Sequence, residues 1–560
     1  MSAAPTGHVV VVGGAVVGLS TALFLAHHGV AVTVVERHAA ALRHPRARMV
    51  NPRTMELYRQ VGIEEQLVAA RSLTADLSAK TMIGAPTLAG PESFSTPMRD
   101  ELPELTSDIT PCTWCAIDQD RLEEIVAKRA AGLGVRLRFA TECTGLTQDG
   151  EGVTVALRDA ATGATETLRA DYFVAADGGR SPVRTALGIS SDGPGIFMET
   201  LSVVVQADLS AALRGRDLGL GYFEQPAPGT LLMPLDGSRW VFYTPHPTDG
   251  DAATVDDAVA VELFRAAIGQ PDLVVGAPEV QIAATGETVL GFEIGAQVAR
   301  SYRDRRVLLA GDAAHTMPPT GALGAGTGVQ DAHNLAWKLA AVLGGTAGPE
   351  LLDTYESERR PVAQLTMAFG MAEMADRTGD EDEEQRPGYA ATLLGYVYRE
   401  GAVVAQDTGA DGPAALDPEL LGRPGTRAPH VPLVLDGTAI SSLDLYGSSF
   451  VLVAGPDGQS WESAVQQARD RLAQPLAVYR IGDGPTDPSG RWADVHGVGA
   501  DGAVLVRPDG FVAWRAPGVG ADPGAELLGA LARVLSLPAP SRTPVSAMSA
   551  RGAVAEGDQP

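Results

Sequence analysis

The chain has 560 residues, of which 45% are hydrophobic, so it can bury several cores and divide into about two to four domains. Its formal net charge of −26 argues against a nucleic-acid partner, which would require clustered basic side chains, and makes small molecules the expected ligands. With only three cysteines, no apolar run of the roughly 18 residues that span a membrane and no signal-peptide features at its start, the chain is expected to be a cytoplasmic protein without a membrane partner.

The first motif runs from a strand of valines into a glycine-rich turn and a helix. Residues 9–12 precede GGAVVGLSTALFLAHHG, and a second strand at 31–35 ends at Glu36. An acidic residue at this distance from the glycines accepts the ribose hydroxyls of a dinucleotide, and the pyrophosphate lies at the helix N-terminus. Ala15 replaces the middle glycine of G-x-G-x-x-G, so a Rossmann-like core without a nucleotide is the alternative.

Three arginines, Arg46, Arg48 and Arg53, lie before or at the start of the next expected helix. An arginine in this place can brace a phosphate or the edge of a flavin. For Arg48 and Arg53 we prefer surface pairing with Glu56 and Glu64.

The segment that follows contains a pair of cysteines and a helix start. Cys112 and Cys115 have redox spacing but lack the strand-to-helix context of a thiol-disulfide motif, so we interpret the spacing as chance. Gln119 opens a helix, where its amide can reach a phosphate or a ribose.

A buried strand at 172–176 ends in Asp177-Gly-Gly-Arg-Ser-Pro-Val-Arg. Arg180, Ser181 and Arg184 form a candidate phosphate cluster beside it. An Asx turn with a solvated arginine is the alternative.

A second buried strand, at 307–310, ends at Gly311 and Asp312, whose carboxylate is placed to bind a sugar hydroxyl. The following PPTGALGAG combines stiff prolines with glycines that admit a flat ligand close to the backbone. The periodic helix after it would aim its N-terminus at the negative edge of a reduced flavin. A strand, a loop and an ordinary core helix without any ligand are the alternative.

The remaining pattern divides the chain into segments. Residues 1–188 and 296–400 are expected to build one nucleotide-binding domain, with an antiparallel sheet at 189–295 inserted between them. The aromatic and methionine side chains of this sheet would either meet a flat substrate or pack on a helix. A linker at 401–424, a small α/β domain at 425–535 and a disordered tail at 536–560 complete the expected order.

Three motifs in fixed order carry a family resemblance: GGAVVG with Glu36, then DGGRSPVR, then GDAAHTMPPTGALGAG. Together they resemble the single-component FAD-dependent aromatic hydroxylases of the para-hydroxybenzoate hydroxylase fold. NPRTMELYRQVGI, LLDTYESERRPVA and LLGYVYREGA are similar to the bacterial members that act on aromatic polyketides. The implied fold class is α/β, with a Rossmann-like FAD-binding domain, an inserted antiparallel β-sheet substrate domain and a C-terminal thioredoxin-like domain that has lost its cysteines.

The resemblance implies a set of FAD contacts. The glycine turn would bind the pyrophosphate, Glu36 the adenosine ribose, Asp312 the ribityl chain, Pro319 the reactive face of the flavin, and 324–326 its pyrimidine ring. The expected cofactor-binding residues are Gly13, Gly14, Ala15, Val17, Gly18, Glu36, Arg37, Arg46, Gln119, Asp177, Gly311, Asp312, Pro319, Gly324, Ala325 and Gly326. The expected substrate contacts are Tyr222, Met233, Trp240, Phe242 and Pro318.

The implied reaction uses NADPH or NADH to reduce FAD, after which O2 adds at flavin C4a and one oxygen passes to an activated carbon of a polycyclic phenol. Baeyer–Villiger insertion or oxidative rearrangement is the enzymatic alternative. A binding protein that has lost its flavin is the non-enzymatic alternative, and Ala15 is its best support. No metal site is expected, and the sequence leaves open whether the chain forms a homodimer. The sequence singles out no catalytic base, because four candidates fit packing or surface roles equally well: Tyr222, Tyr243, His246 and Arg377.

Overall fold

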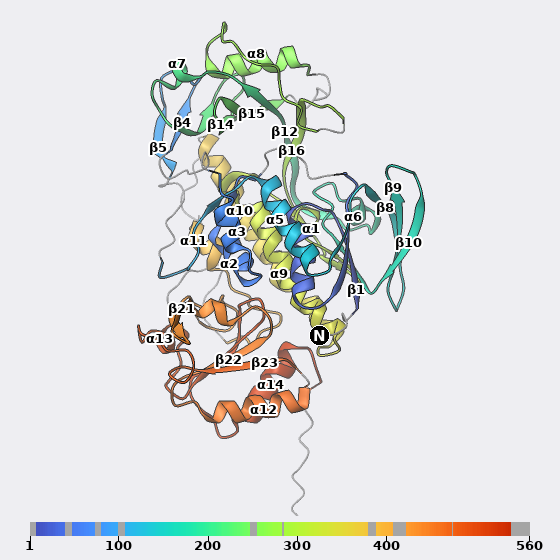
Figure 1. The fold of residues 1–560 in the computed structure, drawn as a ribbon, viewed down its shortest axis with the longest axis vertical. Helices are drawn as coiled ribbons and strands as arrows, with labels where there is room; N and C mark the ends of the chain where they lie inside the picture. Colours follow the sequence, from blue (N-terminus) through green and yellow to red (C-terminus); the bar gives the residue numbers. More distant parts are fainter. Residues whose placement is uncertain are drawn as a thin grey trace, which may run out of the picture.

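The computed structural model describes residues 7–39, 47–72, 80–98, 107–246, 255–282, 285–378, 388–406, 422–472 and 474–538. Three tiers follow one another along the long axis, with the inserted sheet at the top, the nucleotide domain in the middle and the C-terminal α/β unit at the bottom (Figure 1). Arg46, most of the expected linker and nearly all of the expected tail lie outside the described residues.

The middle tier is built on a six-stranded sheet in the order β17-β18-β11-β1-β2-β7, which is parallel except for β17. Its strands are β1 (His8–Val12), β2 (Ala31–Val35), β7 (Arg136–Arg138), β11 (Tyr172–Ala175), β17 (Arg303–Asp304) and β18 (Val307–Leu309). The helices of this tier are α1 (Val16–His27), α2 (Pro52–Gln60), α3 (Glu64–Ala69), α5 (Gln119–Gly132), α6 (Pro182–Ala186), α9 (Gly324–Leu343), α10 (Asp353–Thr378) and α11 (Tyr389–Leu394). The four central strands, β18, β11, β1 and β2, are largely apolar because they are buried under helices such as α1, on which α9 packs in turn.

Two smaller sheets and three short helices complete this tier. A three-stranded antiparallel sheet lies at its side (Figure 1): β8 (Thr141–Gln148), β9 (Val153–Asp159) and β10 (Thr165–Ala170). A two-stranded sheet joins β3 (Met49–Val50) to β6 (Cys115–Ala116). The 3-10 helices are η4 (Gly311–Ala313), η5 (Thr320–Ala322) and η6 (Pro349–Leu352).

The upper tier is an eight-stranded sheet in the order β19-β16-β12-β15-β14-β13-β4-β5. Its strands are β4 (Thr81–Ala85), β5 (Phe94–Pro97), β12 (Ser191–Gln206), β13 (Leu218–Phe223), β14 (Thr230–Asp236), β15 (Arg239–His246), β16 (Val289–Ala299) and β19 (His315–Thr316). The sheet is therefore wider than the expected insertion at 189–295, because β4, β5 and β19 come from the flanking segments. Helix α8 (Asp257–Ile268) covers one face, with the short α7 (Ser210–Leu213) nearby (Figure 1).

The lower tier is a small α/β unit built from residues C-terminal to 421. Its mixed four-stranded sheet runs β23-β22-β24-β25 and buries an apolar cluster on each face. The elements are β20 (Pro432–Leu435), β21 (Thr438–Ser441), η8 (Ser442–Leu445), β22 (Phe450–Ala454), α12 (Ser460–Leu472), β23 (Leu476–Arg480), α13 (Trp492–His496), β24 (Ala503–Val506), β25 (Val512–Ala516) and α14 (Pro523–Val534).

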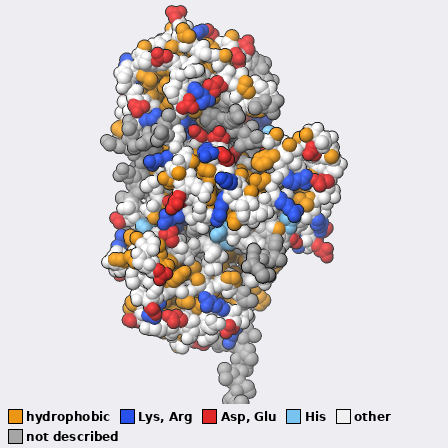
Figure 2. Space-filling view, viewed as in Figure 1, with side chains coloured by type: hydrophobic (Ala, Val, Ile, Leu, Met, Phe, Trp, Pro, Cys, Tyr) orange, Lys and Arg blue, Asp and Glu red, His pale blue; other side chains and the backbone are white. Residues whose placement is uncertain are grey.

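Acidic and basic side chains are interspersed over the face of the molecule that Figure 2 shows. Among the described residues, no helix is both long and apolar enough to cross a membrane. The thiols of Cys112 and Cys115 are buried and form no disulfide with each other.

Candidate functional site

The strand register brings the three sequence motifs together at one edge of the central sheet. Val12 is the Cα partner of both Val35 and Ala175, and Ala175 in turn is paired with Leu309. The residues that follow these four strands therefore share the carboxyl edge of the sheet. Strands β2 and β11 flank β1 on opposite sides, which makes this edge the switch point where α/β sheets bind ligands.

The first turn is closed by glycines that admit no side chain. A Cβ on Gly13, whose φ is +108°, would lie 2.1 Å from the carbonyl oxygen of Ala176, and one on Gly18 would lie 1.9 Å from that of Gly13. Ala15, the N-cap residue of α1, makes no side-chain cap hydrogen bond, but Glu123 of α5 accepts from the Val16 amide at 3.2 Å. The other backbone N–H groups in the first turn of α1 are available to an anion.

Two polar side chains from neighbouring elements complete this end of the site. Glu36 accepts hydrogen bonds from the amides of Gly14, at 2.7 Å, and His38, at 2.8 Å. Gln119 opens α5 as expected, accepts a hydrogen bond from the Ala47 amide at 3.1 Å and donates one to Glu123 at 2.8 Å. Both side chains are thus fixed where the turn meets α5.

The second turn does not form the candidate phosphate cluster. Ser181 donates to Asp177 at 2.6 Å, and burial raises the pKa of that carboxyl. Arg184 donates to the carbonyl oxygens of Ala313 and Gly179, both at 2.8 Å, and so ties this turn to the third one. Arg180 is an exposed partner of Glu293. Hydrogen bonds within the protein engage all three side chains, which favours the alternative of an Asx turn over a phosphate cluster of Arg180, Ser181 and Arg184.

The third turn follows β18 directly. Gly311 has a φ of +61°, and a Cβ there would lie 2.9 Å from the side chain of Val17. Asp312 comes next, and its side chain is exposed to the cavity rather than partly buried. Helix α9 begins at Gly324, and within the described residues no side chain caps it either.

One cavity of about 2100 Å³ connects these turns with the upper sheet. Most expected site residues line it: Gly13, Gly14, Ala15, Val17, Glu36, Arg37, Gln119, Asp177, Tyr222, Met233, Asp312, Pro318, Pro319, Gly324 and Ala325. The carboxyl edge of the central sheet forms one end of the cavity, and side chains of β13, β14 and β16 form another part of its wall.

Of the expected cofactor residues that the structure describes, three do not line the cavity. Gly18 and Gly311 pack inside the turns described above. A Cβ on Gly326 would lie 2.3 Å from Asn51 Nδ2 and 3.0 Å from Thr54 Oγ1, so this glycine faces α2 instead. Its role is to let two helices approach.

Two expected substrate contacts, Trp240 and Phe242, lie on the opposite face of the sheet. Phe242 packs edge-to-face against Phe264 of α8, with ring centroids 5.7 Å apart, and the Trp240 indole donates to the carbonyl of Ala207 at 3.1 Å. Cross-strand pairing sets this orientation, because Phe242 is paired with Leu232 whereas Met233 is paired with Val241. Trp240 and Phe242 therefore cannot share a face with Met233.

Several residues that line the cavity were not among the expected cofactor or substrate contacts. Tyr243 is paired with Leu231 on the cavity face, a position that side-chain alternation from Met233 would have indicated. Phe94 reaches the cavity from edge strand β5, which had no clear sequence signal. Tyr389 donates to the carbonyl of Gly321 at 3.1 Å.

Arg48 and Arg53 differ from the expected surface pairs. Arg48 lines the cavity, donates to Asp118 at 2.8 Å and also donates to the carbonyl of Pro234, so it joins the middle tier to the upper sheet. Arg53 does pair with Glu56, at 2.9 Å, but both side chains are buried.

The residues at the carboxyl edge of the central sheet fit FAD. The first turn has no room for side chains, the backbone amides at the starts of α1 and α9 can face anionic parts of the cofactor, and Glu36 and Asp312 are carboxylates that can accept from hydroxyl groups. The cavity also extends beyond this edge to an apolar wall that includes Met233, Tyr243 and Phe292.

Comparison with known proteins agrees with this geometry. Residues 6–370 match the FAD binding domain family and residues 422–538 the family described as aromatic-ring hydroxylase, C-terminal. The 4-methyl-5-nitrocatechol 5-monooxygenase of Burkholderia sp. is 43% identical over 94% of this chain and 97% of its own length. The tetracenomycin A2 monooxygenase-dioxygenase of Streptomyces glaucescens is 40% identical over 94% and 96%.

A solved structure extends the comparison to three dimensions. The ternary complex of aklavinone-11 hydroxylase with FAD and aklavinone matches with a TM-score of 0.86 and 37% identity, covering 95% of this chain and 99% of that one. Similarity over nearly the whole length of named monooxygenases excludes the alternative of a scaffold that has lost its flavin. The chain therefore belongs to the FAD-dependent aromatic-ring hydroxylases, flavoprotein monooxygenases that use NAD(P)H as co-substrate.

Proposed function

We propose that this monooxygenase hydroxylates a polycyclic phenol of the aromatic polyketide kind. The cavity carries the proposal, because its volume of about 2100 Å³ exceeds the roughly 300–1,000 Å³ of a pocket for one ligand and leaves space for a large flat substrate beside FAD. Its wall beside the upper sheet is apolar and aromatic. Two Streptomyces relatives that are 41% and 38% identical to this chain are named putative polyketide hydroxylases, which supports the same class.

We assign the cofactor contacts from the positions of the lining residues. The amides at the start of α1 bind the pyrophosphate, Glu36 binds the adenosine ribose, and Asp312 binds the ribityl chain. Pro319 and the start of α9 at Gly324 lie against the flavin ring. The orphan N–H groups and the two carboxylates support these assignments, since each would gain a hydrogen-bond partner from FAD.

Bound FAD supplies the electron transfer and oxygen activation that no side chain can perform. The protein orients the substrate ring between Pro318 and the wall formed by Tyr222, Met233 and Tyr243. This largely apolar wall would also exclude bulk water from the reacting atoms, which limits side reactions. The tyrosine hydroxyls of this wall are the groups best placed to hold the substrate phenol.

A first prediction concerns Ala15, the departure from the glycine fingerprint. We expect Ala15→Gly to change FAD affinity by no more than about threefold, because glycine and alanine differ little in bulk and glycine is the better N-cap residue. The dissociation constant is measured by flavin fluorescence quenching. Gly14→Ala is the matched variant and should weaken binding, since its Cβ would lie 2.7 Å from that of Glu36. A large loss of affinity in Ala15→Gly alone would show that the methyl group packs usefully against the cofactor.

A single-ring catechol is the second candidate substrate. It is favoured by the 43% identity to the Burkholderia enzyme, whose name specifies a nitrocatechol. The polycyclic phenol is larger than the catechol, so its turnover should depend more on the part of the cavity wall that lies far from the carboxyl edge of the central sheet. That wall includes Phe94, whose ring centroid lies 6.5 Å from that of Tyr222.

A substitution at Gly84 can distinguish a large from a small substrate. A Cβ on Gly84 would lie 2.1 Å from the Phe94 ring, so Gly84→Ala must displace this ring along the cavity wall. We expect kcat/KM for a tetracyclic phenol to fall at least about tenfold, the cost of a small misfit in an apolar pocket. A single-ring substrate should be affected less. Gly150→Ala is the control, because nothing lies within 4 Å of its added Cβ.

The decisive experiment is stopped-flow reduction of the flavoprotein with NADPH in the presence of naphthacene and anthraquinone phenols or of substituted catechols, followed by mass analysis. Faster reduction with a polycyclic phenol and a product that has gained one ring oxygen are expected. A lactone or an opened ring would favour the Baeyer–Villiger reaction instead. Stimulation by catechols alone would overturn the polyketide assignment.

We further propose O2 as the oxidant and the cytoplasm as the location. A soluble flavin hydroxylase of this family needs both a diffusible oxidant and a supply of reduced nicotinamide cofactor. The free thiols of Cys112, Cys115 and Cys143 support a reducing compartment.

A further inference from the structure

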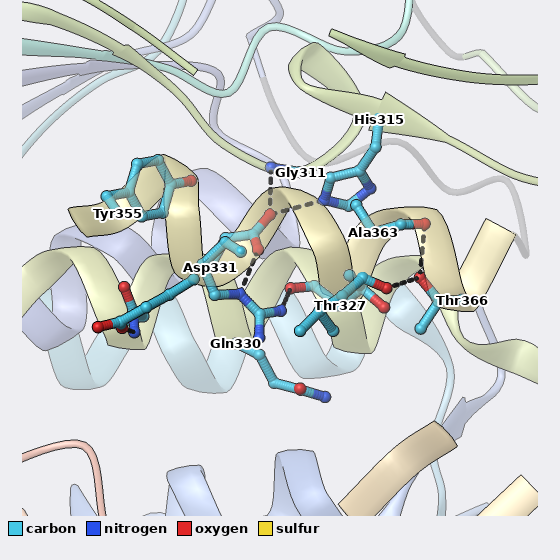
Figure 3. Close-up of polar contacts among 12 residues, drawn as sticks. Gly311, His315, Thr327, Gln330, Asp331, Tyr355, Ala363 and Thr366 are labelled. Atoms are coloured by element: carbon cyan, nitrogen blue, oxygen red, sulfur yellow. Dashed lines mark hydrogen bonds and ion pairs between the residues drawn. The ribbon is translucent and has the colours of Figure 1, made fainter. Parts of the chain in front are cut away.

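The turn that carries Asp312 rests on a fully buried carboxylate, Asp331 of α9. Asp331 Oδ2 accepts hydrogen bonds from the Gly311 amide at 3.2 Å and from His315 Nε2 at 2.6 Å (Figure 3). Burial opposes ionisation, but His315 and Arg359 together hold the pKa of Asp331 below its ordinary value. An ionised carboxylate thus fixes both ends of the segment 311–315.

Arg359 of α10 holds the other oxygen of this carboxylate. Its Nε donates to Asp331 Oδ1 at 2.8 Å, and its two terminal nitrogens donate to the carbonyl of Thr327 and to the hydroxyl of Tyr398, both at 3.2 Å. All of these side chains are buried. The orientation of Asp331 therefore depends on Arg359, and that of Arg359 depends partly on Tyr398.

The C-terminal domain holds Tyr398 by both its ring and its backbone. The ring stacks on Phe511, with centroids 4.3 Å apart and planes inclined by 27°. The Tyr398 amide donates to the carbonyl of Gly425 at 2.8 Å. Phe511 lies at the turn that joins β24 to β25 in the lower tier. It contacts Tyr398, from which hydrogen bonds lead through Arg359 and Asp331 to Gly311 in the third turn.

We propose that the C-terminal domain positions the Gly311–Asp312 turn through Phe511, Tyr398, Arg359 and Asp331. The sequence contains no cysteine from residue 425 onward, so this domain cannot act by disulfide exchange. The proposal gives it a role in cofactor binding instead. None of the four residues lines the cavity, so each acts by positioning. The link to FAD rests on the proposed contact of Asp312 with the cofactor. The experiment below tests the positioning of the turn and the contact with FAD separately.

Tyr398→Phe is the sharpest variant, because it removes only the hydroxyl and keeps the ring on Phe511. Tyr446→Phe is its matched control, since the buried hydroxyl of Tyr446 has no hydrogen-bond partner among the described residues. Phe511→Leu tests the contact from the C-terminal domain, and Asp331→Asn tests the last step. Each full-length variant is compared for hydrogen exchange in the peptide 307–316, for FAD dissociation constant and for thermal midpoint.

We expect Tyr398→Phe and Phe511→Leu to accelerate exchange at the Gly311 amide and to weaken FAD binding by about five- to tenfold, the lower part of the range for coupled sites. Tyr446→Phe should leave both quantities unchanged. Because the residues act in series, Tyr398→Phe should have little further effect in the Asp331→Asn background. A purely structural role would change the thermal midpoint without this non-additivity.

Two results would overturn the proposal: unchanged exchange at Gly311 in both Tyr398→Phe and Phe511→Leu, or effects of Tyr398→Phe and Asp331→Asn on exchange that simply add. Faster exchange with unchanged FAD affinity would support the positioning of the turn and refute the assignment of Asp312 to FAD. The failure of one proposal is therefore distinguishable from the failure of the other.

Discussion

Replacing Glu358 by alanine is expected to lower the free energy of unfolding by about 3–5 kcal/mol at pH 7, the usual cost of leaving buried charges without their partner. Glu358 is fully buried in α10, where it accepts from Arg507 at 2.7 and 2.8 Å and from Lys338 at 2.8 Å. Burial opposes its ionisation, but Arg507 and Lys338 lower its pKa from 4.5 to about 2. The variant would leave Lys338 buried without this carboxylate, and Arg507 would keep its ion pair with Asp509 but lose the one with Glu358.

Urea unfolding of the full-length protein measures this loss. Glu142→Ala is the control, because its ion pair with Arg158 is exposed and such pairs contribute about 0–1 kcal/mol. The folded state lowers the pKa of Glu358, so its contribution is complete above pH 4.5 and is lost as the pH falls toward 2. The difference between wild type and Glu358→Ala should shrink over that interval. Equal losses in Glu358→Ala and Glu142→Ala would mean that the buried network is not stabilising.

Asp312→Ala is expected to weaken FAD binding by about one to two decades, because a charged hydrogen-bond partner contributes roughly 1.5–3 kcal/mol. Its carboxylate lines the cavity directly after β18, at the edge where the three turns meet. The rest of the turn should persist, since Asp331 holds Gly311 independently of the Asp312 side chain. The dissociation constant and the flavin content of the purified protein both report the effect.

Asp312→Asn and Asp304→Ala complete the test of the ribityl assignment. The asparagine keeps one acceptor oxygen and should lose less affinity than alanine. Asp304 lies in β17, away from the residues that line the cavity, and its replacement should leave FAD affinity unchanged. Wild-type affinity in Asp312→Ala would show that another group binds the ribityl hydroxyls.

The sequence by itself determined the local elements that begin and end the nucleotide site. The valine strand, the glycine turn and the acidic end of β2 were all predicted where the structure has them, as was β18 with its Gly-Asp end. These features depend on residues close in the sequence: a period of 2 or 3.6 in hydrophobicity, and glycines that only a tight turn requires. Family motifs in fixed order then linked them to FAD.

Only the tertiary structure decided which side chains face the cavity. Both faces of β15 are apolar, so its sequence did not reveal that α8 would cover Trp240 and Phe242 and leave Tyr243 on the other side. Gly326 was predicted to face the cofactor, but in the structure it faces α2, which packs closely against it. The partners of Arg48, Asp331 and Glu358 lie in distant segments. The hydrophobic pattern of a sequence indicates which side chains are buried. Which residue each buried side chain contacts depends on the packing of segments that are distant in the sequence, and the pattern does not show this.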